Sequence, residues 1–209
     1  MKKLTVMVWV FMTSTLKADY TPPSLPELVL FADKILYGEI HCVDDAVIEV
    51  NVHDSVHHDS KSITIDKFME WDCGRRWKEY EVGDRSLFFL GLSNGRYRVL
   101  GGGNEGELPI HGKKIYVHAS TLSKAGFSGQ FERSGLQREY HGYNDPYNGY
   151  AMDLNDFWQA TVLFKKCFKS DFDETGNLIH VQQVCADKDY AATLKQNRIF
   201  AWSITELKN

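Results

Sequence analysis

The stretch from residue 32 to residue 92 constrains the fold of this chain most, because it repeats short apolar segments separated by turn residues. In residues 46–52, apolar and polar side chains alternate, as in a strand that buries one face. Residues 86–92 (SLFFLGL) are apolar on both faces, which is typical of a central strand. We therefore expect a small barrel or sandwich with strands at residues 35–42, 46–52, 62–68, 86–92, 96–100 and 113–118.

The first 18 residues are interpreted as a secretory signal peptide. Lys2 and Lys3 precede an apolar run at residues 4–12, and a more polar stretch then ends at the small residue Ala18. The apolar run is shorter than the roughly 20 residues that span a bilayer. The mature chain is thus expected to be secreted or periplasmic, with no membrane span after removal of the signal. A buried N-terminal strand is the alternative interpretation.

The charge of the mature chain argues against a nucleic-acid partner. The sequence has 24 Lys and Arg residues, and loss of Lys2, Lys3 and Lys17 leaves 21 against 28 Asp and Glu, a net charge of −7. Binding to a phosphate backbone needs a basic surface, which this composition does not favour.

The chain has four cysteines, and an even number in an exported protein favours disulfides. Cys42 and Cys73 lie in the strand-rich half, whereas Cys167 and Cys185 lie in the C-terminal segment. We predict the disulfides Cys42–Cys73 and Cys167–Cys185. A four-cysteine zinc site is the alternative, but no C-x-x-C pair is present, and no cofactor is expected.

The C-terminal third has a helical pattern. Residues 121–150 are rich in Gly, Ser, Asn, Asp and Tyr and are predicted to be a loop or linker. From Leu154, apolar residues recur every three or four positions, which predicts a helix at 154–168. Alternatively, Cys167 and Cys185 would face each other on a hairpin. Other helical segments are expected at 27–32, packed on the barrel, and at 187–195 and 198–208, the last two within a helical unit at 151–209.

Nine residues in the strand-rich half resemble a known family: Ala32, Asp33, Gly38, Cys73, Gly74, Tyr80, Gly83, Leu87 and Phe89. Over residues 28–118 the chain resembles bacterial members of the superfamily of netrin modules and tissue inhibitors of metalloproteinases. There, Ala-Asp opens the first strand, and a block of Cys-Gly followed by Tyr-x-x-Gly-x-x-x-Leu-x-Phe leads into a central strand. The resemblance implies a five-stranded OB-like barrel at 19–120, and hence a mainly β fold with a helical C-terminal unit (α+β).

The chain departs from this family in one respect. The metalloproteinase inhibitors begin with a cysteine that chelates the zinc of the target enzyme. Here the mature chain is expected to begin at Asp19, and its first cysteine, Cys42, lies inside a predicted strand. Metalloproteinase inhibition by that route is therefore not expected, and an OB-like fold alone assigns no function.

Two groups of side chains are candidate sites. Arg75, Arg76, Trp77 and Tyr80 could form a rim for an anionic or glycan ligand, since these residue types are enriched at binding hot spots. Alternatively, Trp77 and Tyr80 plug one end of the barrel and the arginines are solvated. The second group, His53, His57 and His58, could bind a metal ion, although a solvated hairpin loop is the favoured interpretation.

The sequence contains no recognisable catalytic motif such as G-x-S-x-G or H-E-x-x-H. Gly101 to Gly106 lack the spacing of a phosphate-binding loop, and Glu105 and Glu107 would repel phosphate, so a flexible loop between strands is expected. We therefore expect a non-catalytic binding module with a protein or envelope glycan as partner. The alternatives are an inhibitor that binds an extracellular hydrolase through a barrel loop and a hydrolase with its site between barrel and helices.

Overall fold

The computed structural model describes residues 20–56, 60–72, 74–103, 105–118, 121–122, 138–139, 149–172 and 178–207. The predicted signal peptide, His57, His58, Cys73 and most of the predicted 121–150 loop lie outside these ranges.

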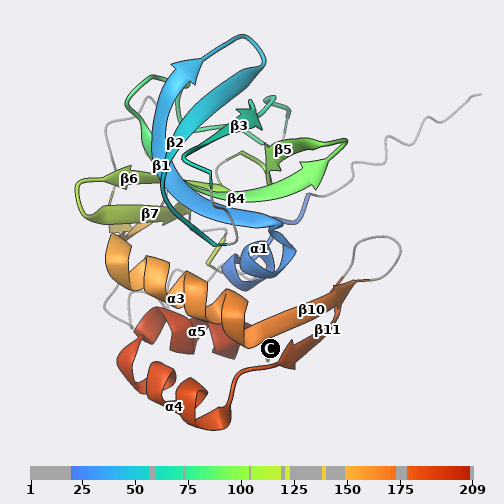
Figure 1. The fold of residues 1–209 in the computed structure, drawn as a ribbon, viewed down its shortest axis with the longest axis vertical. Coiled ribbons are helices and arrows are strands. Elements are labelled where there is room, and N and C mark those ends of the chain that lie inside the picture. Colours follow the sequence, from blue (N-terminus) through green and yellow to red (C-terminus); the bar gives the residue numbers. More distant parts are fainter. Residues whose placement is uncertain are drawn as a thin grey trace, which may run out of the picture.

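A closed barrel of five strands forms the first half of the chain (Figure 1). The order around the barrel is β1-β2-β3-β5-β4, and pairing of β4 with β1 closes it. Strands β3 and β5 run parallel, and the other pairs are antiparallel. This confirms the expected OB-like barrel. Its strands are β1 (Lys34–Val43), β2 (Val47–Val56), β3 (Ser62–Asp66), β4 (Arg85–Ser93) and β5 (Arg96–Val99).

The sheet extends beyond the barrel from β4. The added strands are β6 (Glu107–His111), β7 (Lys114–His118), β9 (Gly149–Asp153) and β8 (Arg138–Glu139). Sequence patterns predicted β7 but missed β6, because Pro109 cannot donate a ladder hydrogen bond and argues against a strand. They also missed β9, which starts inside the predicted loop and ends inside the predicted helical unit.

Two apolar cores lie on opposite faces of β1 and β4. Leu36, Phe88 and Leu90 point into the barrel, where they pack with residues of β2 and β3. Leu87 and Phe89 point the other way, into a core shared with the helices. The apolar character of residues 86–92 on both faces is explained by this shared position between the two cores.

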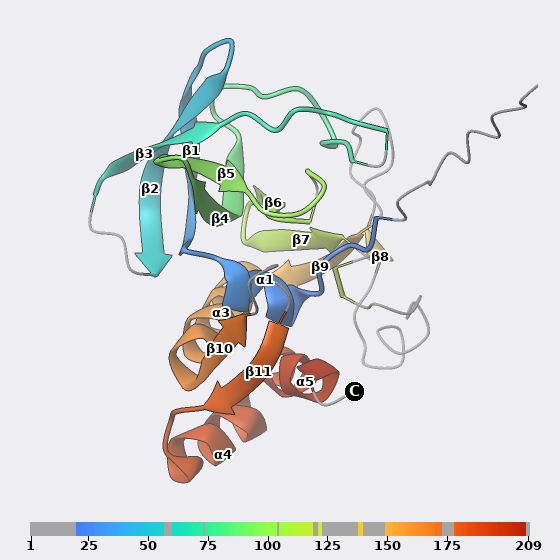
Figure 2. The same cartoon turned by 90° about the vertical axis from the view of Figure 1, so that its right-hand side faces the viewer.

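The helices form a layer beneath the barrel, seen from two sides in Figures 1 and 2. The predicted helix at 154–168 is confirmed as α3, and the hairpin considered as its alternative follows it directly. The helical segments predicted at 27–32, 187–195 and 198–208 are also confirmed. The elements are α1 (Leu25–Phe31), α3 (Leu154–Cys167), β10 (Phe168–Phe172), β11 (Leu178–Gln183), α4 (Asp187–Gln196) and α5 (Arg198–Leu207).

Of the two predicted disulfides, only Cys167–Cys185 is formed, with its Cα atoms 4.6 Å apart. It joins the end of α3 to the segment after β11. The Cys42–Cys73 prediction is wrong, because Cys42 is an exposed free thiol at the end of β1. Gly74, the neighbour of Cys73, packs instead against Trp71 and the backbone of Gly102.

Gly38 has a structural reason for being glycine. It lies at a register shift between β1 and β2, and a Cβ atom at this position would collide with the backbone oxygen of Asn51. Any side chain here would force the two strands apart, so the requirement for glycine follows from the close approach of the two strands.

Helix α1 begins at a capping box. The Ser24 hydroxyl accepts a hydrogen bond from the backbone nitrogen of Glu27, whose carboxylate in turn accepts one from the backbone nitrogen of Ser24. We expect Ser24→Ala to lower the free energy of unfolding by about 1 kcal/mol. Chemical denaturation would measure this, with Ser62→Ala, an exposed serine of β3, as the control. Equal losses in the two variants would contradict the capping role.

Candidate binding site at one end of the barrel

The connection between β3 and β4, residues 67–84, carries the predicted rim residues. Tyr80 packs against the core inside the barrel, and its hydroxyl accepts a hydrogen bond of 3.2 Å from the backbone nitrogen of Phe68. This bond holds the two ends of the connection together beside the barrel core.

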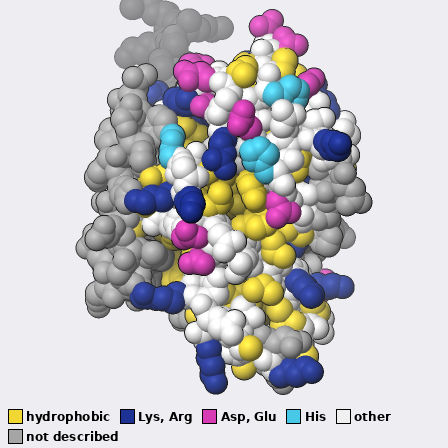
Figure 3. All heavy atoms as spheres, turned by 60° about the vertical axis from the view of Figure 1, so that its left-hand side comes forward, with side chains coloured by type: hydrophobic (Ala, Val, Ile, Leu, Met, Phe, Trp, Pro, Cys, Tyr) yellow, Lys and Arg dark blue, Asp and Glu magenta, His cyan; other side chains and the backbone are white. Residues whose placement is uncertain are grey.

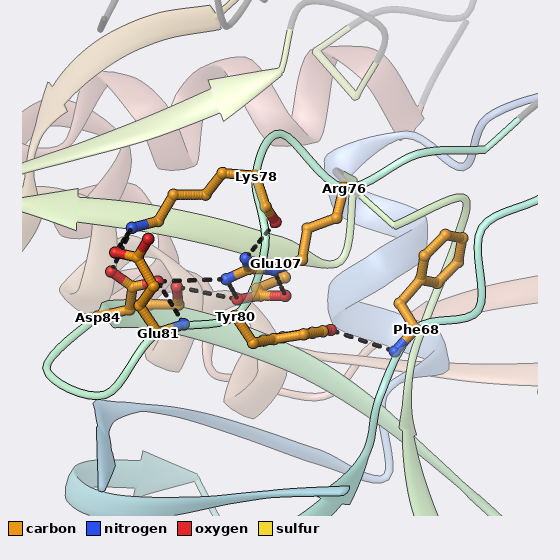
Figure 4. Close-up of polar contacts among 8 residues, drawn as sticks. Phe68, Arg76, Lys78, Tyr80, Glu81, Asp84 and Glu107 are labelled. Carbon is orange, nitrogen blue, oxygen red and sulfur yellow. Dashed lines mark hydrogen bonds and ion pairs between the residues drawn. The ribbon is translucent and has the colours of Figure 1, made fainter. Parts of the chain in front are cut away.

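Arg76 anchors this connection to β6 through a buried ion pair (Figure 4). Its Nε and Nη2 atoms donate to the two carboxylate oxygens of Glu107 at 3.0 and 2.8 Å, a bidentate arrangement. Its Nη1 atom donates to the carbonyl oxygen of Lys78 at 2.6 Å. The Ser86 hydroxyl donates to the same Glu107 carboxylate at 3.2 Å. Both carboxylate oxygens of Glu107 are therefore bound within the protein.

The aromatic rings complete the environment of the Arg76 guanidinium, which lies 3.8 Å from the centre of the Tyr80 ring and 4.4 Å from that of Trp77. Burial would lower the pKa of Arg76, but the Glu107 carboxylate more than offsets this effect and the pKa lies above its usual value. Burial, with the charge of Glu107, raises the pKa of Tyr80. The Tyr80 phenol is therefore un-ionised at neutral pH beside the Arg76 guanidinium.

These contacts show that the predicted open rim for a ligand does not form. Arg76 and Trp77 are each only 8% exposed, so neither is available to a ligand, and Arg76 is not solvated as the alternative assumed. Tyr80 packs against the core inside the barrel, whereas Trp77 packs on Tyr116 of β7. Of the four predicted binding residues, Arg75 alone is exposed.

The exposed part of the connection carries two large apolar side chains among charged ones. Met69 is 85% exposed and Trp71 is 44% exposed, although both belong to residue types that usually avoid water. Trp71 exchanges two backbone hydrogen bonds with Gly74 and makes an edge-to-face contact with Tyr20, with ring centroids 5.1 Å apart. These contacts fix the turn that presents Trp71. Met69, Trp71 and Arg75 are called the connection surface below.

Glu105 lies next to this surface, in the segment predicted as a flexible loop, and it is almost fully buried. Its carboxylate accepts hydrogen bonds from the Tyr20 hydroxyl, at 3.4 Å, and from the backbone nitrogen of Gly102. Burial raises the pKa of Glu105, and these hydrogen bonds only partly oppose the effect. Sequence reasoning did not identify Glu105 and Glu107 as structural residues. The pattern that could have indicated their burial is the position of both acidic residues directly before the apolar run Leu108–Ile110.

The raised pKa of Glu105 predicts a pH-dependent effect of Glu105→Gln. A carboxyl whose pKa is raised by folding binds more protons in the folded state, so its contribution to stability falls as pH rises above the usual value of 4.5. The variant should therefore gain stability relative to the native protein between pH 4.5 and 7. Denaturation across this range measures the difference, with the exposed Glu70→Gln as control. A constant difference for Glu105→Gln would contradict this expectation.

The fold brings no further described metal-binding side chain to the predicted site at His53, His57 and His58. His53 is exposed on β2, with its ring in edge contact with Tyr37, and His57 and His58 lie outside the described residues. In the part of the chain that the structure describes, no three His, Cys, Asp or Glu side chains gather to hold a metal ion.

The face drawn in Figure 3 mixes charged and apolar side chains. Lys and Arg side chains are spread over it instead of forming one basic stripe of the kind that binds phosphate backbones. No described helix is both long enough and apolar enough to cross a bilayer.

By fold, the chain belongs to the proteins that combine an OB-like barrel with a helical unit. Compared with family models, curated proteins and solved structures, it gives no match. Function must therefore be argued from the site itself.

Proposed function

We propose that this protein is an exported, non-catalytic binding module of the netrin-module and metalloproteinase-inhibitor type, and that it binds a protein partner through the connection surface. The observation that carries the proposal is the exposure of Met69 and Trp71 on a connection anchored by a buried ion pair. Export, to the periplasm or the extracellular space, is supported by the Cys167–Cys185 disulfide together with the signal-like N-terminus.

The chemistry of the connection surface favours a protein over a glycan. Trp, Met and Arg are the residue types enriched in the cores of protein interfaces, and an exposed methionine offers a flexible apolar contact. The Arg76–Glu107 pair and the Trp71–Gly74 bridge hold the backbone before binding. Less conformational entropy is then lost when a partner binds, which increases affinity.

Site-specific photocrosslinking in the native host tests the proposal. A benzophenone side chain placed at position 69 should yield one dominant protein adduct, identified by mass spectrometry. The same group at Thr64, exposed on the outer face of β3, is the control and should not yield that adduct. Trp71→Ala should weaken binding of the identified protein about 30-fold, the effect of losing a hot spot of roughly 2 kcal/mol.

The outcomes separate the alternatives. Equal adducts from positions 69 and 64 would contradict the connection surface. Absence of any protein adduct, with binding to purified envelope glycan that Trp71→Ala abolishes, would replace the protein partner with a glycan. An adduct with a hydrolase whose activity falls on binding would identify the module as an inhibitor acting through a barrel loop.

A further inference from the structure

A cavity of about 250 Å³ lies beside the anchored connection. Its walls come from the connection, from the start of β4 and from the turn between β6 and β7. A cavity of about 150 Å³ holds benzene, so this one has room for a small organic acid or an amino-acid side chain. The residues that matter below are Lys78, Asp84, Arg85, His111 and Gly112.

Arg85 differs from the other cations around the cavity. Arg76 and Lys78 are already paired with carboxylates, Arg76 with Glu107 and Lys78 with Asp84 at 2.7 Å. Arg85 forms no ion pair with any described residue, not even with Glu39, its cross-strand neighbour on β1. Its Nε atom is buried and has no hydrogen-bond partner, an arrangement that is unfavourable for a charged donor.

The one hydrogen bond that the Arg85 side chain makes to a described residue is weak. Its Nη1 atom donates to the carbonyl oxygen of Gly112 at 3.4 Å, near the limit for such a bond. Arg85 lines the cavity, and its Nε and Nη2 atoms make no hydrogen bond to a described residue. This edge of a guanidinium matches the two oxygens of a carboxylate.

The surrounding charges favour an anion. His111 lines the cavity, Lys113 follows Gly112 on the same turn, and Lys114 begins β7. The one carboxylate in the wall, Asp84, is held by Lys78 and lies 3.8 Å from the Arg76 guanidinium. Its charge is thus offset within the protein.

We propose that this cavity binds a carboxylate, with Arg85 as its bidentate partner. The carboxylate belongs either to a free small acid or to the end of a peptide chain. The cavity is a separate feature from the connection surface, so the proposal does not depend on the function proposed above.

Titration with sodium acetate tests the proposal in the full mature chain. The Nε–H signal of Arg85 and the backbone amide signals of Gly83 and Gly112 are followed by ¹⁵N NMR. Acetate should shift all three signals along saturable curves, whereas sodium chloride at equal ionic strength should not. Signals that do not saturate, or that move equally in chloride, would overturn the proposal.

Two variants and a peptide pair sharpen the test. Arg85→Lys keeps the positive charge but loses the two parallel N–H donors of the guanidinium. Acetate binding, measured from the amide signals of Gly83 and Gly112, should therefore weaken at least about tenfold. Arg98→Lys, in an exposed ion pair with Asp66, should leave binding unchanged. If Arg85→Lys does not fold, the acetate and chloride titrations of the native protein decide.

A peptide pair distinguishes the two sources of the carboxylate. If acetyl-Ala-Ala binds more tightly than acetate, and amidation of its C-terminus abolishes this binding, the site is assigned to the end of a peptide chain. Equal binding of the peptide and of acetate assigns the site to a free acid.

Discussion

Arg76→Met is expected to lower the free energy of unfolding by about 3–5 kcal/mol, the largest effect of any single change considered for this chain. The substitution keeps most of the apolar volume of the side chain but leaves the Glu107 carboxylate buried, 0% exposed in its side chain, without a cation. Chemical denaturation of the purified mature chain measures the loss.

A second substitution separates the ion pair from simple packing. Replacing both partners, as Arg76→Met with Glu107→Leu, removes the unpaired charge and should recover at least about half of the lost stability. Arg98→Met is the matched control, because its ion pair with Asp66 is exposed and worth about 0–1 kcal/mol. A double variant less stable than Arg76→Met alone would contradict a buried, mutually dependent pair.

Removing the Cys167–Cys185 disulfide should cost about 3 kcal/mol, the value expected for a cross-link between residues 18 apart. In a chain of this size that corresponds to a fall in Tm of about 6–12 °C. The loss should be largest in the β10–β11 hairpin, because a two-stranded sheet is marginally stable without further support. Thermal unfolding of Cys167→Ala/Cys185→Ala and hydrogen exchange at β10 and β11 measure the two effects.

Cys42 provides the control for the disulfide experiment. It is exposed and free, so Cys42→Ser should leave Tm unchanged within error. Reduction of the native protein with dithiothreitol should reproduce the loss seen in the double alanine variant. An equal loss in Cys42→Ser would show that Cys42 has a covalent partner after all.

The strands and helices could be predicted because they depend on local patterns. The alternation in β2 indicates that one face of this strand is buried, and the continuous apolar run in β4 indicates that both of its faces are buried. The three- and four-residue spacing in α3 does the same for a helix. β6 could not be predicted, because Pro109 weakens the pattern and its pairing with Ser86 depends on a distant strand.

The candidate site shows the limit of such patterns more clearly. Residue type alone singled out Arg75, Arg76, Trp77 and Tyr80 as candidates, but it could not say which of them face solvent. That depended on Glu107, 31 residues beyond Arg76, which is brought to the guanidinium only when β6 pairs with β4. The same long-range packing left Met69 and Trp71 exposed.

By itself, the sequence determined the helices, the five barrel strands and β7, the barrel class and one of two disulfides, because periodicity and neighbouring positions carry this information. Only the tertiary structure decided that Arg76 is an anchor and not a ligand contact, that Cys42 is free, and that Arg85 lies beside a cavity with no carboxylate partner among the described residues. Burial and charge pairing depend on residues far apart in the chain, and their positions are fixed only when the sheet closes.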